Sequence, residues 1–120
     1  MAKNKPLDEH KEEKGAYLVI NNQIFPLNKE VTTIGRKLGN DLVIQDFLVS
    51  RSHAEIRLED GKYYLHDLDS TGGTFLNQKK VSKGLLYSGD IILLTSVPVM
   101  FIDDTTALDI PPEEDTGDFT

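Results

Sequence analysis

Three short polar stretches of the chain carry side chains that could bind an anion. They are residues 35–41, 49–53 and 69–74. Together they hold two arginines, one lysine, five hydroxyl groups and four glycines. Guanidinium groups, hydroxyls and the backbone N–H groups that glycines leave accessible are donors that converge on tetrahedral oxyanions. The three stretches therefore predict a site for a phosphate group.

The distribution of charge favours a single phosphate over a polyanion. The chain has 120 residues and a net charge of −7. Residues 103–120 contain seven acidic residues and no basic one, whereas acids and bases balance in residues 1–14 and in residues 15–102. Proteins that bind nucleic acid or anionic membranes usually carry a basic surplus. Neither nucleic acid nor a membrane is therefore expected as a partner.

Composition also bears on metals, cofactors and location. The chain has no cysteine, which excludes a disulfide, a thiolate zinc site and a cysteine nucleophile. The three histidines lack partners at the spacing of metal ligands, so neither a metal nor a cofactor is expected. Residues 1–14 have no apolar signal-peptide core, and no run of about 18 apolar residues occurs. A cytoplasmic location is predicted.

Short strands must position the three polar stretches, because no helical periodicity longer than two turns occurs. Runs rich in Val, Ile, Leu, Tyr and Phe, bounded by turn residues, are expected as strands. They are residues 17–20, 23–27, 31–34, 42–44, 53–59, 62–68, 74–76, 90–94 and 97–102. Asp60-Gly61 and Asn21-Asn22 are expected as two-residue turns, and Lys79, Lys80 and Lys83 as part of a solvated turn. This pattern predicts an antiparallel sandwich or a small barrel.

The two ends of the chain differ from its middle. Residues 1–14 and 103–120 contain only seven apolar residues between them. We therefore expect one folded domain over residues 15–102, a disordered N-terminal tail over residues 1–14 and an acidic disordered tail over residues 103–120.

Several motifs, in order along the chain, resemble those of the forkhead-associated (FHA) domain family. They are Ile34-Gly35-Arg36, Ser50-Arg51-Ser52-His53 and residues 67–77, with residues 39–44 similar to the loop between the first two motifs. The resemblance covers about residues 16–102. It implies an all-β fold of the FHA/SMAD-like class, a two-sheet antiparallel β-sandwich of roughly eleven short strands. It also implies a phosphothreonine-peptide-binding module that acts as an adaptor in Ser/Thr kinase signalling.

The resemblance assigns a role to each matching residue. It implies that Arg36 reaches the phosphate and that the Ser50 hydroxyl donates to a phosphate oxygen. Arg51 matches a position that often supplies a second phosphate contact, and Thr71 matches a further one. His53 matches a structural histidine, and Gly35 and Gly73 match glycines that set the conformation of the loops.

Position 72 departs from the family's pattern. The family has an Asn there, whose side chain holds the backbone of the bound peptide, whereas this chain has Gly72. One neutral hydrogen bond is worth about 0.5–1.5 kcal/mol, so its loss is expected to lower affinity by up to about tenfold, and Gly72→Asn to restore it. The alternative is a degenerate FHA-like module that binds a protein partner by a sheet face without phosphate.

An enzyme is not expected. A triad of Ser50, His53 and one Asp matches no nucleophile elbow, and no phosphate-binding P-loop motif occurs. The expected partners are a phosphothreonine-containing protein or peptide and a Ser/Thr kinase. Thr105, Thr106 and Thr116 are candidate phosphorylation sites, which makes the chain's own phosphorylated tail a further candidate ligand, unless the tail only improves solubility.

Overall fold

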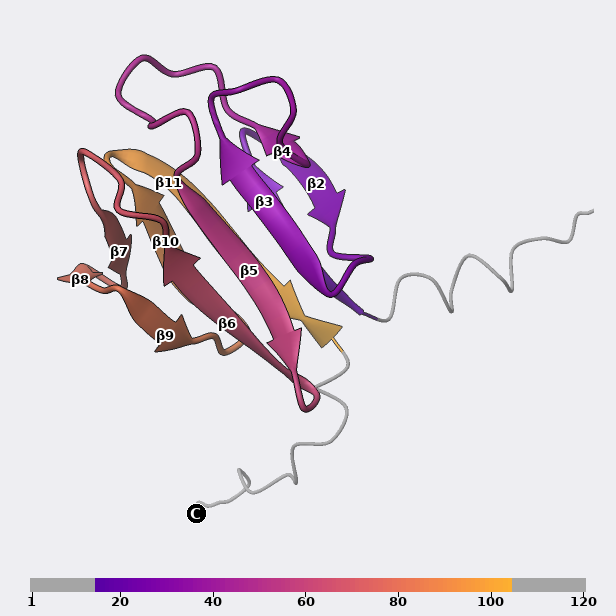
Figure 1. Ribbon diagram of the computed structural model, residues 1–120. Coiled ribbons are helices and arrows are strands. Elements are labelled where there is room, and N and C mark those ends of the chain that lie inside the picture. The colour runs from indigo at the N-terminus through magenta and orange to yellow at the C-terminus, as the bar shows by residue number, and fades with distance from the viewer. Residues whose placement is uncertain (1–14, 105–120) are drawn as a thin grey trace, which may run out of the picture.

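Strands with alternating inward and outward side chains build the described part of the molecule, residues 15–104 of a computed structural model (Figure 1). In β1 (Ala16–Ile20), for example, Ala16, Leu18 and Ile20 are buried, while the residues between them are half-buried. The tails over residues 1–14 and 105–120, with Thr105, Thr106 and Thr116, lie outside the described residues.

The strands form two sheets, which confirms the all-β sandwich expected from the sequence. The six-stranded sheet has the order β2-β1-β11-β10-β7-β8, and the five-stranded sheet has the order β4-β3-β5-β6-β9. The remaining bounds are β2 (Gln23–Pro26), β3 (Val31–Gly35), β4 (Leu42–Val43), β5 (Ala54–Glu59), β6 (Lys62–Asp67), β7 (Thr74–Leu76), β8 (Lys79–Lys80), β9 (Lys83–Leu85), β10 (Ile91–Leu94) and β11 (Val97–Asp103). The pairs are antiparallel except for β3 and β4, which run parallel.

The core lies between the two sheets and is filled by aliphatic side chains and one phenylalanine. Phe101 from β11 is fully buried, and its ring centroid lies 5.5 Å from that of Tyr63 in β6. Leu18, Ile56 and Leu65 are also almost completely buried. Each such side chain contributes about 1.5–3 kcal/mol when it leaves water, so the core holds the two layers, and their loops, in place.

The expected two-residue turns are confirmed. Asp60 and Gly61 have φ of 53° and 79°, and Glu59 pairs with Lys62 across the turn. Asn21 and Asn22 have φ of 51° and 64° between β1 and β2. Positive φ at both central residues is the geometry of type I′ hairpins, which suits the right-handed twist of the strands.

The expectation of a solvated turn around Lys79, Lys80 and Lys83 was wrong. Lys79 and Lys80 form β8, which pairs with β7, and Lys83 begins β9, which pairs with β6. Both strands lie at sheet edges, where lysines protect exposed backbone groups from pairing with other chains. The sequence of such a short polar strand does not identify it, because it forms only beside the strand with which it pairs.

Strand β11 extends to Asp103, one residue beyond the expected domain boundary at residue 102.

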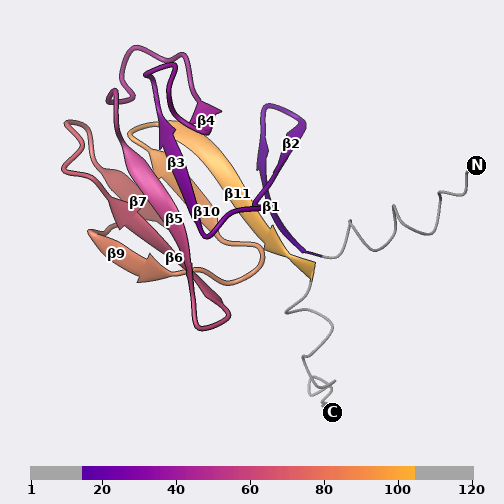
Figure 2. The ribbon, with the colours of Figure 1, turned by 45° about the vertical axis from the view of Figure 1, so that its right-hand side comes forward.

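Four of the connections at one end of the sandwich position the polar stretches, and the two ribbon views agree on their place (Figures 1 and 2). They are the β3–β4 loop (residues 36–41), the β4–β5 loop (44–53), the β6–β7 loop (68–73) and the β10–β11 turn (95–96). We call this the loop end. All three polar stretches singled out in the sequence lie here. Over residues 15–104, no helix has the length and apolar character needed to span a membrane.

Candidate anion-binding site

Backbone hydrogen bonds join the β3–β4 loop to the β4–β5 loop. The Arg36 N–H donates to the Ser50 carbonyl oxygen at 3.0 Å, and the Lys37 N–H donates to the Arg51 carbonyl oxygen at 3.1 Å. The His53 N–H donates to the Ile34 carbonyl oxygen at 2.9 Å. These bonds place Arg36 directly beside Ser50, although the two residues are 14 positions apart.

Gly35 allows this close approach of the two loops. A Cβ atom at position 35 would collide with the carbonyl oxygen of Arg51 and lie 2.8 Å from the Asn40 side-chain nitrogen. That nitrogen donates to the carbonyl oxygens of Arg51, at 2.8 Å, and of Lys37, at 2.9 Å. Gly35 is therefore needed for space, and Asn40 holds the two loops together. Sequence reasoning did not single out Asn40.

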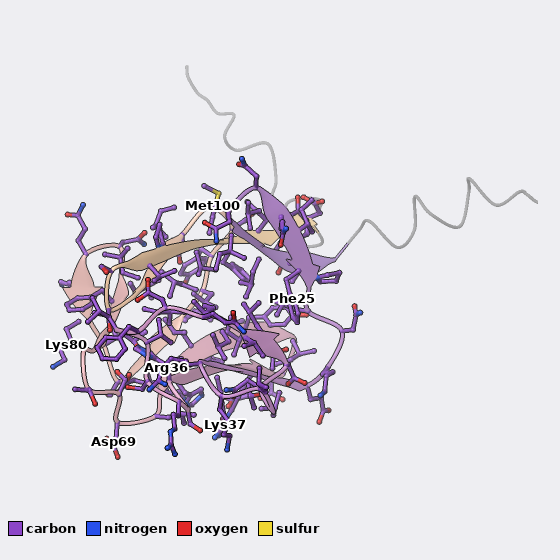
Figure 3. All side chains as sticks on the ribbon, turned by 90° about the horizontal axis from the view of Figure 1, so that it is seen from above. Phe25, Arg36, Lys37, Asp69, Lys80 and Met100 are labelled. Carbon is purple, nitrogen blue, oxygen red and sulfur yellow. The ribbon has the colours of Figure 1, made fainter. Side chains whose placement is uncertain are left out.

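The Arg36 side chain is anchored at one nitrogen and exposed at its end. Its Nε donates to the Val49 carbonyl oxygen at 2.9 Å. The ion pairs found among residues 15–104 do not involve Arg36, Lys37 or Arg51. In Figure 3, Arg36 and Lys37 appear on the same side of the molecule as Asp69, opposite Met100. The anchored guanidinium thus keeps its terminal N–H groups for an incoming anion.

Ser50 connects the β4–β5 loop to the β6–β7 loop. Its Oγ accepts a hydrogen bond from the Thr71 backbone N–H at 2.9 Å. Because the Ser50 oxygen acts as an acceptor here, its O–H can still donate to a ligand. Arg36, Ser50 and Thr71, from three separate loops, are therefore brought side by side. Arg51, also assigned a phosphate contact, is exposed beside them.

His53 lies beneath these loops and has no exposed surface. Its Nδ1 accepts a hydrogen bond from the Ser50 backbone N–H at 3.0 Å, so the neutral ring donates from Nε2 to the Gly73 carbonyl oxygen, also at 3.0 Å. Both ring nitrogens are thus engaged with backbone groups of two loops. This geometry differs from that of a catalytic triad, in which the imidazole contacts the serine hydroxyl.

Asp67 organises the β6–β7 loop, a role that sequence reasoning missed. Its carboxylate accepts hydrogen bonds from the hydroxyls of Ser70 and Thr74, both at 2.6 Å, and from the Ser70 N–H at 3.2 Å. Burial raises the pKa of Asp67, but these hydrogen bonds outweigh it and hold the pKa below the ordinary value of 3.8. The local signal was available, because an Asp at the start of a loop often accepts hydrogen bonds from backbone N–H groups a few residues later.

The two neighbouring glycines of this loop have different surroundings. Gly73 has a φ of 92°, and its carbonyl oxygen accepts from His53 and from the Thr95 N–H. Gly72 is exposed and lies outside the left-handed region. A Cβ atom at position 72 would collide with the side chain of Thr95 in the β10–β11 turn. Thr95 therefore brings the β10–β11 turn into contact with the β6–β7 loop.

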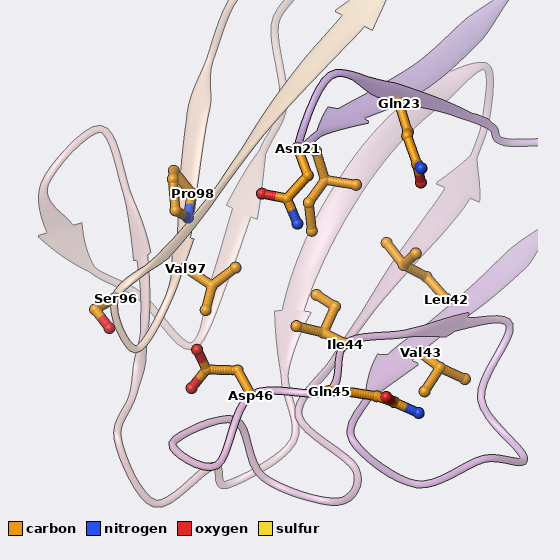
Figure 4. A pocket seen from close by; sticks show the side chains of 11 residues that line it. Asn21, Gln23, Leu42, Val43, Ile44, Gln45, Asp46, Ser96, Val97 and Pro98 are labelled. Carbon is orange, nitrogen blue, oxygen red and sulfur yellow. The ribbon is translucent and has the colours of Figure 1, made fainter.

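A hollow opens beside the β10–β11 turn, between the two sheets (Figure 4). Asn21, Gln23, Gln45, Asp46 and Ser96 supply its polar lining, and Leu42, Ile44 and Val97 are among its apolar neighbours. Phe47 and Leu48 follow Asp46 in the β4–β5 loop and are exposed.

Among residues 15–104, no group of three or more His, Asp or Glu side chains is arranged to hold a metal ion.

Comparisons with known proteins identify one domain family. A family model described as FHA domain matches residues 32–95. The glycogen accumulation regulator GarA of Mycolicibacterium smegmatis is 32% identical over 78% of this chain and 55% of its own length. The oxoglutarate dehydrogenase inhibitor of Corynebacterium diphtheriae is 35% identical over 69% of this chain and 58% of its own length. The chain thus spans little more than half the length of these relatives.

A solved structure from an analysis of phosphothreonine-dependent FHA domain interactions is also similar. It superposes with a TM-score of 0.70 and 30% sequence identity, and the match covers 73% of this chain and 95% of that one. Nearly the whole of that chain is therefore matched by this one.

Proposed function

The chain belongs to the FHA domain family, and on that premise we propose that its loop end binds phosphothreonine-containing peptides. The proposed role is that of an adaptor in Ser/Thr kinase signalling, in line with relatives named as a regulator and as an inhibitor. The predicted cytoplasmic location belongs to the same proposal.

One observation carries this proposal. The Arg36 guanidinium, the Ser50 hydroxyl and the Thr71 side chain come from three loops that are joined by the Ser50–Thr71 hydrogen bond and supported from below by His53. Such donors, fixed before the ligand arrives, bind a dianionic phosphate with little loss of conformational freedom. We assign the principal charge contact to Arg36, hydroxyl contacts to Ser50 and Thr71, and a second charge contact to Arg51.

Calorimetric titration tests the proposal. Phosphothreonine peptides with varied flanking residues are compared with their unphosphorylated twins and with phosphoserine versions. We expect binding only of the phosphorylated peptides, because the site supplies donors for an anion. Equal binding of the unphosphorylated twins would instead support a protein-interaction module that does not need phosphate.

A specific observation favours that second candidate, contact with a folded protein through a sheet face. Across the outer face of the six-stranded sheet, Ile24, Val19, Met100 and Ile91 lie in one row of paired residues. Ile24 is 65% exposed and Met100 37%. The outer face of the five-stranded sheet carries more charge, since Glu55, Arg57, Glu59 and Lys83 lie there beside Val31 and Tyr64. Solvated sheet faces are normally polar, so an apolar one is suited to a protein partner. Ile24→Lys and Met100→Lys would separate this contact from phosphate binding.

The chain's own tail is the further ligand we propose, and the fold limits how it can bind. Strand β11 begins at the loop end and ends at the opposite end of the sandwich (Figure 1). The strand is about 20 Å long, whereas Thr106 follows Asp103 by only about 10 Å of extended chain. Phosphorylated Thr106 could therefore enter only a second molecule. Thr116, with about 45 Å of chain, can reach its own loop end.

A further inference from the structure

Thr95 stands in a backbone conformation that disfavours its side chain. It is the first residue of the two-residue turn between β10 and β11, and its φ is 61°. Ser96, the second residue, does not have a positive φ. This is the pattern of a type II′ turn, which favours glycine at the first position, and β-branched residues are rare there. A threonine in this place calls for a reason beyond the turn.

Gly72 presents the opposite case. Its φ lies outside the left-handed region, so its backbone does not require glycine. What excludes a side chain is Thr95, since a Cβ at position 72 would collide with Thr95 Oγ1 and lie 2.7 Å from Thr95 Cγ2. The backbone at position 72 would allow a side chain, but the space that this side chain would occupy holds the side chain of Thr95.

The Thr95 hydroxyl is held between the β4–β5 loop and the β6–β7 loop. Its O–H donates to the Leu48 carbonyl oxygen at 3.1 Å, and the Thr95 N–H donates to the Gly73 carbonyl oxygen at 2.9 Å. The hydrogen bond from the Thr95 hydroxyl to Leu48 is exposed to solvent, and so is Gly72. Because the hydroxyl proton is used on Leu48, the lone pairs of the oxygen remain as acceptors for an N–H group.

We propose that Thr95 contacts the main chain of the bound peptide next to the phosphothreonine, in the place where other FHA domains use an Asn at the position of Gly72. The proposal rests on the proposed function. The Thr95 oxygen accepts a hydrogen bond from a peptide N–H group. Thr95 lies against Gly72, the residue that directly follows Thr71, to which we assign a phosphate contact. Thr95 is then a specificity-determining residue that compensates for the missing Asn, and Gly72→Asn alone would gain no contact, contrary to the expectation from the sequence.

Backbone esters in the ligand test this contact directly. The tightest binder from a phosphothreonine peptide library is remade with one amide N–H at a time replaced by an ester oxygen. One ester is expected to weaken binding to the wild type and to Thr95→Ser by about two- to tenfold, the value of one hydrogen bond. The same ester should not weaken binding to Thr95→Ala, in which the acceptor is already missing.

Two other results would overturn the contact. Ester effects that are the same in Thr95→Ala as in the wild type at every position would show that Thr95 only ties the loops together. A wild-type protein that binds phosphopeptides but tolerates every ester would exclude any such acceptor. If the wild type binds no phosphopeptide, the proposed function itself fails, and the contact with it.

Exchanging the two residues provides a second test. Thr95→Gly should fold and bind about two- to tenfold more weakly, and Gly72→Asn should bind no more tightly than the wild type, because its side chain meets Thr95. The double variant Gly72→Asn/Thr95→Gly should regain wild-type affinity. Unchanged binding by Thr95→Gly, together with tighter binding by Gly72→Asn, would contradict the proposal.

Discussion

The loop end has two halves that are built in different ways. In the half that we propose binds phosphate, called the phosphate half, Arg36, Ser50 and Thr71 are held by local motifs and by the buried His53. In the half that we propose contacts the peptide main chain, called the peptide half, Gly72 is packed against Thr95. The first half follows the family's pattern residue by residue, whereas the second departs from it.

The difference shows which interactions a binding loop can exchange. A phosphate needs several charge-assisted contacts at fixed positions, because each contributes strongly and depends on direction. A peptide main chain offers neutral N–H and C=O groups, and a hydrogen bond to one of them is worth only about 0.5–1.5 kcal/mol. Such a contact can move from one loop to another at small cost. We therefore expect large effects from changes in the phosphate half and small ones in the peptide half.

The largest effect is expected for Arg36→Ala. Removing one partner of a charge-assisted contact typically costs about 2–5 kcal/mol, so affinity for a phosphothreonine peptide should fall by about 30-fold or more in calorimetry. The thermal midpoint should move by less than about 4 °C, because the side chain is exposed.

Lys62→Ala is the matched control for Arg36→Ala. It removes the same charge from an exposed residue at the β5–β6 turn, far from the loop end. Its binding should equal that of the wild type. Equal losses in both variants would mean that overall charge, and not a site at Arg36, attracts the ligand.

The second largest effect concerns stability and is expected for His53→Ala. The substitution leaves the Ser50 N–H and the Gly73 carbonyl oxygen without their buried partner. We expect a loss of about 2–4 kcal/mol in the free energy of unfolding, measured with urea, together with weaker phosphopeptide binding. A variant with wild-type stability would show that the loops do not depend on this histidine.

A smaller, pH-dependent effect is expected for Asp67→Asn. The pKa of Asp67 is lowered in the folded protein, so the carboxylate stabilises the fold above the ordinary value of 3.8, and this stability is lost as pH falls through the lower folded value. Near pH 7, the free energy of unfolding of the variant should be about 1–3 kcal/mol lower than that of the wild type. The difference from wild type should shrink below about pH 4. A difference independent of pH would point to packing instead of charge.

The smallest effect depends on the tail and on protein concentration. With Thr106 phosphorylated, light scattering should detect dimers or longer chains, because that residue is too close to the far end of β11 to reach its own site. With Thr116 phosphorylated, the mass should stay that of a monomer, since a tethered ligand acts at an effective concentration of about 1 mM. A monomer with Thr106 phosphorylated and dimers with Thr116 phosphorylated would contradict this account of how far the tail can reach.

Much of the fold and of the phosphate half could be predicted from the sequence. Alternating residues in β5 and the Asp60–Gly61 turn are local signals, and the β5–β6 hairpin of the five-stranded sheet follows from them. Arg36 and Ser50 stand in short motifs whose order is typical of the family. The structure places both residues at the loop end, while their contacts with a phosphate remain a prediction.

The remaining features depend on contacts between distant residues. Thr95 and Leu48 are 47 positions apart, and nothing near either of them indicates that they meet across Gly72. The short strands β8 and β9 have no apolar alternation of their own and form only because β7 and β6 lie beside them. Asp67 is different, since its turn signal was local and was overlooked.

Amide shifts in a peptide titration test the central claim most directly, namely that the loop end is a phosphate-dependent site. Nitrogen-15-labelled protein is titrated with a phosphothreonine peptide and with its unphosphorylated twin. We predict that the amides of Arg36, Ser50 and Thr71 shift with the phosphopeptide alone, and that the Thr95 amide shifts with them, while residues of β9 stay unchanged. Equal shifts with both peptides, or none at these amides with a peptide that binds, would contradict the account.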